Sequence, residues 1–432
     1  MKTSVKMLCF LLLLAAAVGC GNRSGADGDR EGAGGLKEGA GGVEPVTLTF
    51  FTEGNSAVLA ETIGQLVADK YPHITLNTIK SAKGTLIEDM MNSGTPIDLI
   101  SYSLGGLGKM KELGLLTDLT PFIDKTKFDL NRFTEGVVDT VRSYVPDGKI
   151  MLVPFELNNN VLFYNKGIFN KFGVPYPKDG MTWEQIYELA KRVTRSDGGV
   201  QYKGFQMEGI NLVYKNQMGL RFVNTETLKS EVNTDSWNRW VETMAAFYQI
   251  QGNEPTENYK INFLKNQNLA MATGPNFLTE IPEAVERGLD WDVVSLPRFA
   301  GMENRGSQMN APYYLIPPTS RHKDAAFQVI QYMLSDEVQA KMARIGRVPI
   351  VKNEQVRTEY GKDLKGMEGK NLAAFFKDTM GAPVPITPYD AIAKSTLNAY
   401  FSKVSLGQLD VNTALRQAEE EINKAIEAEM KK

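Results

Sequence analysis

The side chains that could carry out catalysis are few in this sequence. Ser320 and Lys323 have the S-x-x-K spacing in which a serine acts as the nucleophile of acyl transfer. The segments that complete such a site are missing, because no K-T-G is present and the nearest match to its S-x-N segment, at Ser307, has the wrong spacing. The two histidines, His73 and His322, are expected at the surface. We therefore expect no enzyme, no metal and no cofactor, and keep a serine acyltransferase as an alternative.

Cys20 is the other residue with distinctive chemistry. Lys2 and Lys6 precede an apolar run that ends in small residues just before this cysteine, and the run is too short to span a bilayer. The pattern resembles a bacterial lipoprotein signal, with Ala17 where leucine is usual. The resemblance implies that the signal peptide, residues 1–19, is removed and that the sulfur of Cys20 carries the lipid. A plain secretory signal is the alternative.

Composition limits what the rest of the chain can be. Residues 20–44 are rich in glycine and poor in apolar side chains, which predicts a disordered tether behind the lipidated cysteine. The only cysteines are Cys9 and Cys20, so the mature body is expected to have no disulfide. The net charge of −3, with both signs spread along the chain, argues against nucleic acid as a partner. The remaining length exceeds what one hydrophobic core usually supports, and we expect two lobes.

Strands and helices alternate after the tether. Residues 46–51, 74–79 and 96–101 are rich in β-branched and aromatic side chains, and helical patterns separate them. This alternation predicts crossover units and a mostly parallel sheet. Thr182 and Gln185 have the spacing of a capping box at the start of a helix. The tryptophans and other apolar side chains between residues 237 and 247, at helical spacing, predict a buried helix face.

Several segments form an ordered series of landmarks. They are residues 69–79, 94–100, 114–119, 148–184, 263–272 and 325–349. The series resembles that of the extracellular solute-binding proteins of ATP-driven importers (family 1, which includes maltose-type sugar binders), and it covers the chain from residue 46 to about residue 428. The resemblance implies an α/β, two-lobed, periplasmic-binding-protein-like fold of type II, with a central cleft and strand hinges.

The resemblance also implies where the lobes begin and end. Three crossings between them are expected near residues 153–156, 315–318 and 381–385, each of which contains a proline. The lobes are then expected to comprise residues 45–153 plus 318–380, and residues 154–317 plus 381–432.

The cleft of such a fold needs a few hydrogen-bonding groups and aromatic faces at strand ends and hinges. The candidate ligand-binding residues at those places are Glu53, Asn55, Ser56, Tyr102, Ser103, Glu156, Asn158, Asn159, Asn276, Phe277, Tyr313, Tyr314 and Tyr389. Of the adjacent pair Tyr313 and Tyr314, one is expected to face the cleft. Sugar binders of the family often carry a tryptophan where this chain has Asn276 and Phe277, so a smaller or less flat ligand surface is an alternative. Trp183 is expected in the core, and the place of Trp291 stays open.

The function that the resemblance implies is capture and delivery of a solute. We expect a lipid-anchored monomer on the extracytoplasmic face of the cell membrane, which binds a carbohydrate or a similar polar solute. Its protein partners would be the permease subunits of an ABC importer. A sensor subunit on the same fold is a further alternative, which the sequence does not separate from the transport role.

Overall fold

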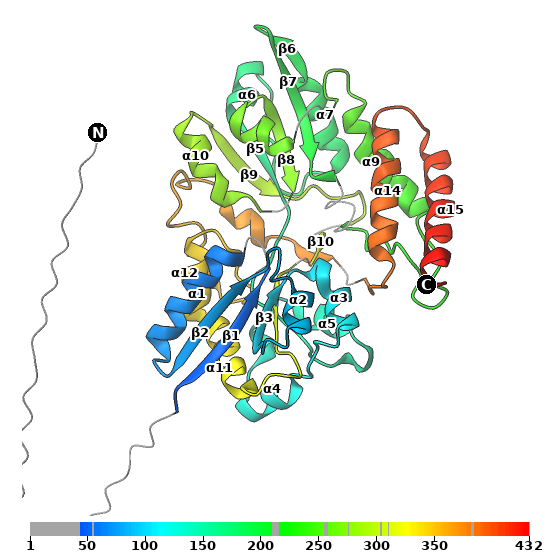
Figure 1. Ribbon diagram of the computed structural model, residues 1–432. Coiled ribbons are helices and arrows are strands. Elements are labelled where there is room, and N and C mark those ends of the chain that lie inside the picture. The colour runs from blue at the N-terminus through cyan, green and yellow to red at the C-terminus, as the bar shows by residue number, and fades with distance from the viewer. Residues whose placement is uncertain are drawn as a thin grey trace, which may run out of the picture. The chain divides into compact units, whose positions relative to one another are not determined.

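The computed structural model shows a mixed α/β body with two five-stranded sheets (Figure 1). The residues that the structure describes are 44–53, 56–209, 216–254, 258–274, 276–302, 305–309, 311–381 and 384–431. The predicted signal peptide, Cys20 and nearly all of the predicted tether lie outside them. Within these ranges no helix is both long enough and apolar enough to cross a membrane.

The first sheet has the strand order β2-β1-β3-β11-β4. Its strands are β1 (Val46–Thr52), β2 (Ile74–Lys80), β3 (Leu99–Tyr102), β4 (Val153–Pro154) and β11 (Tyr313–Leu315). The first three are parallel, as predicted, and β11 runs antiparallel to both β3 and β4. Leu48, Phe50 and Phe51 of β1 are buried, and α1 (Ser56–Lys70) and α11 (Lys323–Met333) pack against this sheet.

The second sheet has the strand order β6-β7-β8-β5-β9. Its strands are β5 (Val161–Asn165), β6 (Arg195–Asp197), β7 (Val200–Met207), β8 (Leu269–Gly274) and β9 (Trp291–Ser295). Strands β7 and β8 are parallel, and β5 runs antiparallel to both β8 and β9. Helices α6 (Lys166–Phe172), α7 (Trp183–Val193) and α9 (Asp235–Tyr248) contact this sheet directly or through one another.

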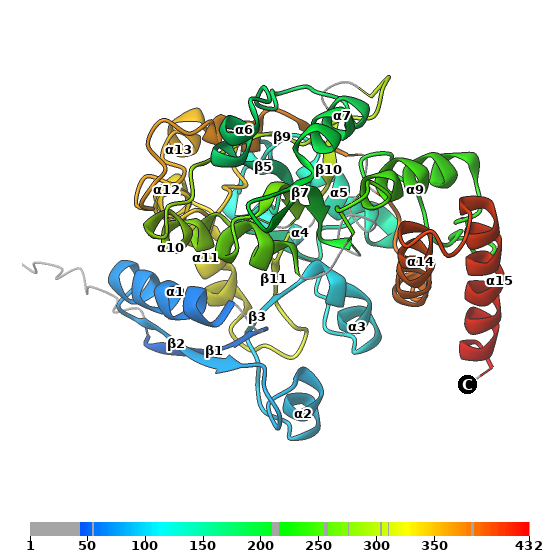
Figure 2. The ribbon, with the colours of Figure 1, turned by 90° about the horizontal axis from the view of Figure 1, so that it is seen from above.

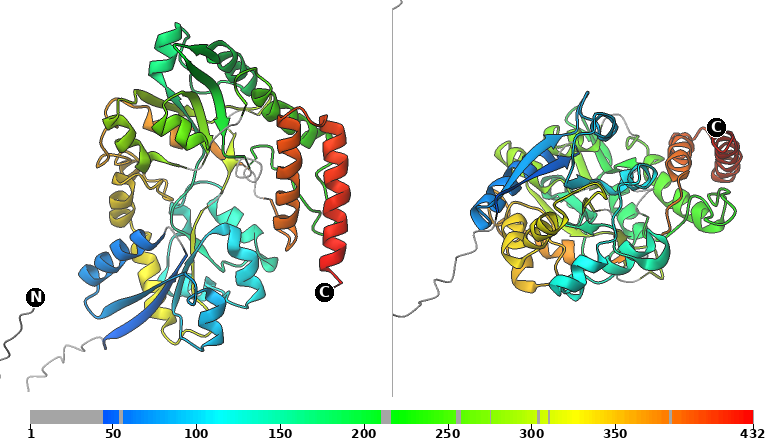
Figure 3. Two further views of the ribbon diagram at one scale, coloured as in Figure 1. Left: turned by 45° about the horizontal axis from the view of Figure 1, so that its top comes forward. Right: turned by 60° about the horizontal axis from the view of Figure 1, so that its bottom comes forward.

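Local sequence signals explain the helices around the second sheet. The capping box predicted at α7 is present, since the Gln185 N–H donates to Thr182 Oγ1 and the Thr182 N–H donates to Gln185 Oε1. Trp183 is buried as predicted, and so is the tryptophan-bearing face of α9. Two further helices, α14 (Asp390–Ser405) and α15 (Val411–Glu429), pack side by side and against α9 (Figures 2 and 3).

The remaining elements are short. They are α2 (Ile87–Asn92), α3 (Leu107–Glu112), α4 (Thr120–Thr126), α5 (Val137–Ser143), α10 (Ile281–Glu286), α12 (Asp336–Arg344), α13 (Glu354–Arg357), β10 (Arg305–Gln308) and β12 (Thr379–Gly381). Strands β10 and β12 pair in parallel as a small sheet of their own. Ser335 is the N-cap residue of α12, because its side chain accepts the N–H of Val338.

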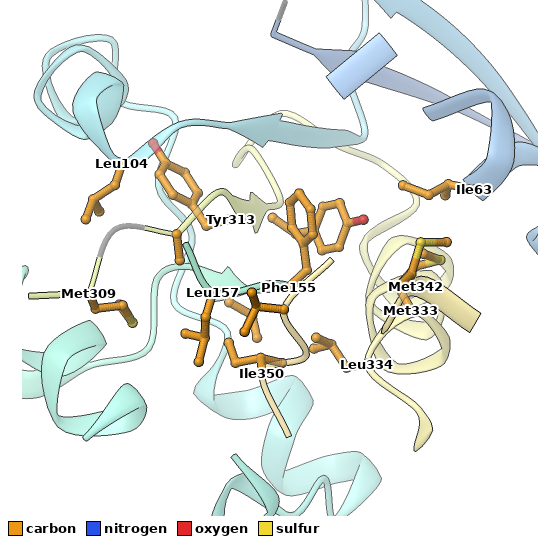
Figure 4. Close-up of a cluster of buried hydrophobic side chains, with 14 of the residues drawn as sticks. Ile63, Leu104, Phe155, Leu157, Met309, Tyr313, Met333, Leu334, Met342 and Ile350 are labelled. Atoms are coloured by element: carbon orange, nitrogen blue, oxygen red, sulfur yellow. The ribbon is translucent and has the colours of Figure 1, made fainter. Parts of the chain in front are cut away.

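One hydrophobic core joins the first sheet to the segments that leave it. Leu104, Phe155, Tyr313 and Met342 all belong to this cluster, although they come from four separate parts of the chain (Figure 4). The ring of Phe155 stacks on that of Tyr314 at 4.2 Å between centroids. The chain therefore leaves the first sheet through a segment that is itself part of the core.

The predicted lobe limits are not tested as whole lobes, but two parts of the chain bear on them. Strand β11 lies in the first sheet, although the predicted limits assign residues 313–315 to the second lobe. Asn371, which the limits assign to the first lobe, donates its backbone N–H to Asp292 of β9 in the second sheet.

Candidate functional site

Strand directions bring one edge of each sheet to the segments that link the sheets. Because β11 is antiparallel to β3 and to β4, strands β1, β3 and β4 all end at the same edge of the first sheet. From β4 the chain runs through residues 155–160, which we call the first link, to the start of β5. The start of β5 pairs with the ends of β8 and β9. Strand β7 is parallel to β8 and ends there too. We refer to these two edges as the linked edges.

Buried hydroxyl groups mark the linked edge of the first sheet. Thr52 and Ser101 lie opposite each other at the ends of β1 and β3, and both are at most 1% exposed. Neither side-chain oxygen has a hydrogen-bond partner among the residues that the structure describes. Buried polar groups without partners are rare in native proteins, and each needs an explanation such as a ligand or an ordered water.

Three predicted site residues, Glu53, Tyr102 and Ser103, directly follow Thr52 and Ser101 in the sequence. Glu53 Oε2 accepts the N–H of Ser103 at 3.0 Å, so the two predicted residues connect the ends of β1 and β3. Burial and the neighbouring Glu53 raise the pKa of Tyr102 to about 12, which keeps its hydroxyl protonated. The ring of Tyr102 rests against Gly106, where a Cβ would lie only 2.0 Å from Tyr102 Cε1. The lack of a side chain at Gly106 therefore allows the ring of Tyr102 to take this position.

A second set of unpaired polar atoms lies at the linked edge of the second sheet. Glu208 follows β7, and its Oε2 is buried without a partner in the described part of the chain. The hydroxyl of Tyr259 is likewise buried without a partner among the described residues, and burial together with the nearby Glu208 raises the pKa of this hydroxyl above the ordinary value. Gly274, at the end of β8, makes this approach possible, because a Cβ there would lie 2.5 Å from the Tyr259 oxygen.

A small pocket with a volume of about 30 Å³ lies between the two halves of the molecule, and we call it the cleft pocket. It is lined by residues that come from the first half, the second half and the links, among them Leu104, Tyr144, Phe222, Gln308, Ile386 and Asp390. The side-chain nitrogen of Gln308 is buried and lacks a partner among the described residues. The lining of the cleft pocket is thus mostly apolar, with a few polar groups.

Helix α14 presents a polar stripe beside the cleft pocket. Asp390, Lys394 and Asn398 follow one another at i, i+4 and i+8 and so lie on one helix face. Thr387 donates its hydroxyl to Asp390 Oδ1 at 2.6 Å. Burial lowers the pKa of Lys394 to about 8, which Asp390 partly offsets, and burial raises the pKa of Asp390.

Two asparagines predicted as ligand residues, Asn158 and Asn276, are joined by a hydrogen bond. Asn158 Oδ1 accepts the N–H of Asn276 at 2.9 Å, which connects the first link to the end of β8. The amide of Asn276 donates to the Gly346 carbonyl and to the Tyr360 hydroxyl, at 2.9 and 3.0 Å. These hydrogen bonds thus connect the first link, the end of β8 and the turn after α12. Contact of the two asparagines with a ligand stays a prediction.

Glu156 is predicted as a ligand residue and has a partner inside the protein. Its Oε1 lies 3.2 Å from Arg347 Nη1, and its side chain is only 14% exposed. Burial raises the pKa of Glu156, and the Arg347 guanidinium opposes this effect. The pair connects the first link to the turn after α12.

The other predicted residues lie in varied surroundings. Tyr313, Tyr314 and Phe277 are at most 1% exposed, so both tyrosines of the adjacent pair are buried. Asn159 donates its amide to the Phe375 carbonyl, and Tyr389 is the N-cap residue of α14, where it is partly buried. Asn55 lies outside the described residues, and of Ser56 only its place as the first residue of α1 is described.

Sequence reasoning missed most of the unpaired groups. Thr52 and Ser101 are ordinary strand residues in the sequence, and only their pairing at one edge distinguishes them. Glu208 and Tyr259 lie in a region where no strand was predicted. A signal that could have found Glu208 is its position directly after the apolar β7, where parallel strands place functional groups.

The serine of the S-x-x-K segment is held for a structural purpose. Ser320 is buried, and its hydroxyl donates to Asp98 Oδ1 at 2.7 Å. Lys323 donates its ammonium to the Ser320 backbone carbonyl. Because the Ser320 side chain is buried away from any substrate, and the lysine ammonium donates to the backbone instead of accepting the serine proton, the arrangement does not favour acyl transfer.

Comparisons with known proteins agree with this architecture. The family model of the bacterial extracellular solute-binding proteins matches residues 56–340. The sn-glycerol-3-phosphate-binding periplasmic protein UgpB of Brucella melitensis is 24% identical over 333 residues, which cover 70% of this chain and 73% of that protein.

Solved structures show the same fold. An ABC substrate-binding protein of Listeria monocytogenes in complex with cycloalternan has a TM-score of 0.71 and 20% identity, and covers 89% of this chain and 99% of its own. A sugar transporter of Rhizobium etli in an open conformation has a TM-score of 0.73 and 19% identity, with 87% and 99% covered. The predicted two-lobed α/β fold is confirmed. Since the family model covers more than half of the chain, the chain belongs to the bacterial extracellular solute-binding proteins.

Proposed function

We propose that this protein captures a carbohydrate or a related polyol between its two sheets and delivers it to the permease of an ABC importer. The observation that carries the proposal is the set of buried, unpaired polar atoms at both linked edges, on Thr52, Ser101, Glu208 and Tyr259, as far as the described residues show. Hydroxyls and carboxylates of this kind suit a ligand with many hydroxyl groups, because each can accept a hydrogen bond from such a ligand.

The relatives support the same ligand chemistry. One is named for sn-glycerol 3-phosphate and one was solved with cycloalternan, and hydroxyl groups are common to both compounds. The family membership and the name of the Listeria protein support the importer as the destination. Binding would favour whichever arrangement of the halves contacts the ligand best, by its differential affinity for that state.

Calorimetry tests the ligand class and the site together. We expect the protein to bind at least one of maltose, mannobiose, cycloalternan and sn-glycerol 3-phosphate. Glu208→Gln removes the charge and keeps the shape, so the affinity should fall at least about tenfold, since a hydrogen bond to a charged group contributes about 1.5–3 kcal/mol. Glu188→Gln, at an exposed residue of α7, is the matched control and should bind like the wild type. The proposal is overturned if no compound binds, or if Glu208→Gln binds as the wild type does.

The lipid anchor on Cys20 is part of the proposal. Its support is the sequence pattern around the cysteine and the extracellular place of the family. Mass spectrometry of the mature N-terminal peptide should show a diacylated cysteine as its first residue. A free thiol at Cys20, or a start at another residue, would contradict it.

A further inference from the structure

A groove lies at the end of the first sheet opposite the linked edge, and we call it the basal groove. Its volume is about 630 Å³, which exceeds that of the cleft pocket, and the two share no lining residue. The lining comes from the start of β1, from the end of α2 and the segment that leads to β3, from Leu115 and from the segment that follows β11. Because the proposed solute site lies at the other end of this sheet, the basal groove needs an explanation of its own.

The lining of the basal groove combines apolar and basic side chains. Its apolar part is formed by Met91, Pro96, Ile97, Leu115 and Pro317. Met91 is 39% exposed, so part of this apolar surface is open to solvent. The basic residues of the lining are Arg321 and His322, and threonines complete it. Such a surface suits a partner that has both an apolar part and an anionic part.

The two basic side chains are available to a partner. Both Arg321 and His322 are exposed, and within the described ranges neither side chain takes part in an ion pair or a hydrogen bond. The acidic residue nearest to them in the sequence, Asp324, pairs with Lys125 of α4 instead. The Arg321 guanidinium can bind two oxygens of one phosphate group at once, and the imidazole of His322 can donate to a third.

The carboxylate of the lining does not cancel this charge at the surface. Asp98 is only 4% exposed, and its oxygens accept the Thr49 N–H and the Ser320 hydroxyl. Because Asp98 is buried and already bonded to the protein, the charged group that the basal groove presents to solvent is the Arg321 guanidinium. The groove is therefore expected to attract anions.

The basal groove lies close to the start of the described chain. Thr47 of its lining follows Glu44, the first described residue, by three positions. Figure 1 shows the start of β1 at the end of the first sheet that lies away from the second sheet. The predicted tether, residues 20–44, has an r.m.s. reach of about 25–30 Å as a glycine-rich coil. A membrane that holds a lipid on Cys20 is therefore within reach of the groove.

We propose that the basal groove binds the head group of an anionic phospholipid, with the phosphate at Arg321 and the start of the acyl chains against Met91 and Leu115. The contact holds the first half of the molecule against the membrane that carries the anchor. This inference goes beyond the capture of a solute. It rests on the anchor in the proposed function only for the presence of a membrane beside the groove.

Vesicle flotation tests the basal groove without the anchor. The chain from residue 20 onward, with Cys20→Ser, carries no lipid. It should float with vesicles of phosphatidylglycerol and phosphatidylcholine, but not with vesicles of phosphatidylcholine alone. Arg321→Gln should weaken this binding about fivefold, which is the usual effect of one basic side chain at an anionic surface. Met91→Glu should weaken it at least as much, because a carboxylate repels the phosphate. Arg192→Gln, at an exposed residue of α7, removes the same charge and should bind like the parent chain.

Three results would overturn the proposal. The first is that the chain without lipid does not bind the anionic vesicles. The second is that Arg321→Gln and Arg192→Gln weaken binding equally, since the overall charge would then explain it. The third is that inorganic phosphate binds at Arg321 in calorimetry while vesicles do not, because the groove would then serve a soluble anion.

These results are independent of the proposed function. Arg321→Gln should bind the solute of the wild type with unchanged affinity, because Arg321 lies away from the linked edges. Mass spectrometry of the residue at position 20 tests the anchor separately. A free thiol at Cys20 would remove the anchor and would leave the vesicle result as it is.

Discussion

The polar residues between the sheets divide into two groups by what their atoms contact. The Asn158 side chain accepts the backbone N–H of Asn276, and the Asn276 side chain donates to the Gly346 carbonyl, so both residues maintain the shape of the site. Thr52, Ser101 and Glu208 keep buried oxygens without partners inside the described part of the chain. The unpaired oxygens of the second group destabilise the free protein, because they are buried without hydrogen bonds. A ligand that bonds to them would offset this loss of stability.

Asp378 makes the stability of the protein depend on pH. Its pKa is about 6 in the folded protein, above the ordinary value of 3.8. Between these values the folded state holds the proton more strongly than the unfolded state, so the contribution of this group to stability falls as the pH rises from about 4 to about 6. Asp378→Asn should therefore gain melting temperature relative to the wild type at pH 7.5 and show a smaller gain at pH 4.5. Thermal unfolding at both pH values checks this, and an equal difference at the two would contradict it.

At the scale of elements, sequence patterns predict the features that depend on residues close together in the sequence, such as helix caps. They do not predict contacts between residues that are far apart in the sequence. The capping box of α7 involves two residues that are three positions apart, Thr182 and Gln185, and it was predicted. The Asn158 side chain and the Asn276 N–H lie 118 positions apart in sequence, and only the pairing of β5 with β8 brings them together. The candidate site was predicted where strand ends could be located, as at Glu53 and Tyr102, and was missed at Glu208, where β7 was not recognised.

Asp98 lies just before β3, at the end of the first sheet opposite the linked edge. Its side chain connects β3 to β1 and to the segment that follows β11. Its Oδ2 accepts the N–H of Thr49 at 3.0 Å, and its Oδ1 accepts the Ser320 hydroxyl after β11. Ser320→Ala would leave this buried carboxylate with one partner fewer, so we expect the free energy of unfolding to fall by about 1–3 kcal/mol. Ligand affinity should not change, because Ser320 lies away from the linked edges.

Denaturant unfolding and calorimetry check this prediction. Ser402→Ala is a matched control, because Ser402 is exposed and its hydroxyl bonds only to the backbone of its own helix. It should have little effect on stability. If Ser320→Ala had the unfolding free energy of the wild type but no longer bound ligand, a structural role of Ser320 would be contradicted. The alternative of a reactive serine would then have to be considered again.

At the scale of the whole molecule, the open point is which half carries the segment of residues 363–378. On one side, Asp363 pairs with Arg344 of α12 through side chains that are 45% and 40% exposed, and the Asp363 N–H also donates to the Arg344 carbonyl at 3.0 Å. On the other side, Asn371 and Lys377 bond to Asp179 and to β9 beside the second sheet. Exposed ion pairs contribute little, whereas a backbone N–H bonded to a carboxylate is among the stronger hydrogen bonds. We therefore expect this segment to move with the second sheet, in contrast to the predicted lobe limits.

Distances between spin labels can decide this, because the only native cysteines are Cys9 and Cys20. In a chain with both changed to serine, cysteines would replace the exposed residues Lys125 of α4, Glu188 of α7 and Lys365, two at a time. When a compound that binds is added, the distance between positions 365 and 125 should change, because these positions would lie on different moving halves. The distance between positions 365 and 188 should stay constant. The opposite pattern would assign the segment to the first half, and the hydrogen bonds to Asp179 and β9 would then have to break whenever the halves move.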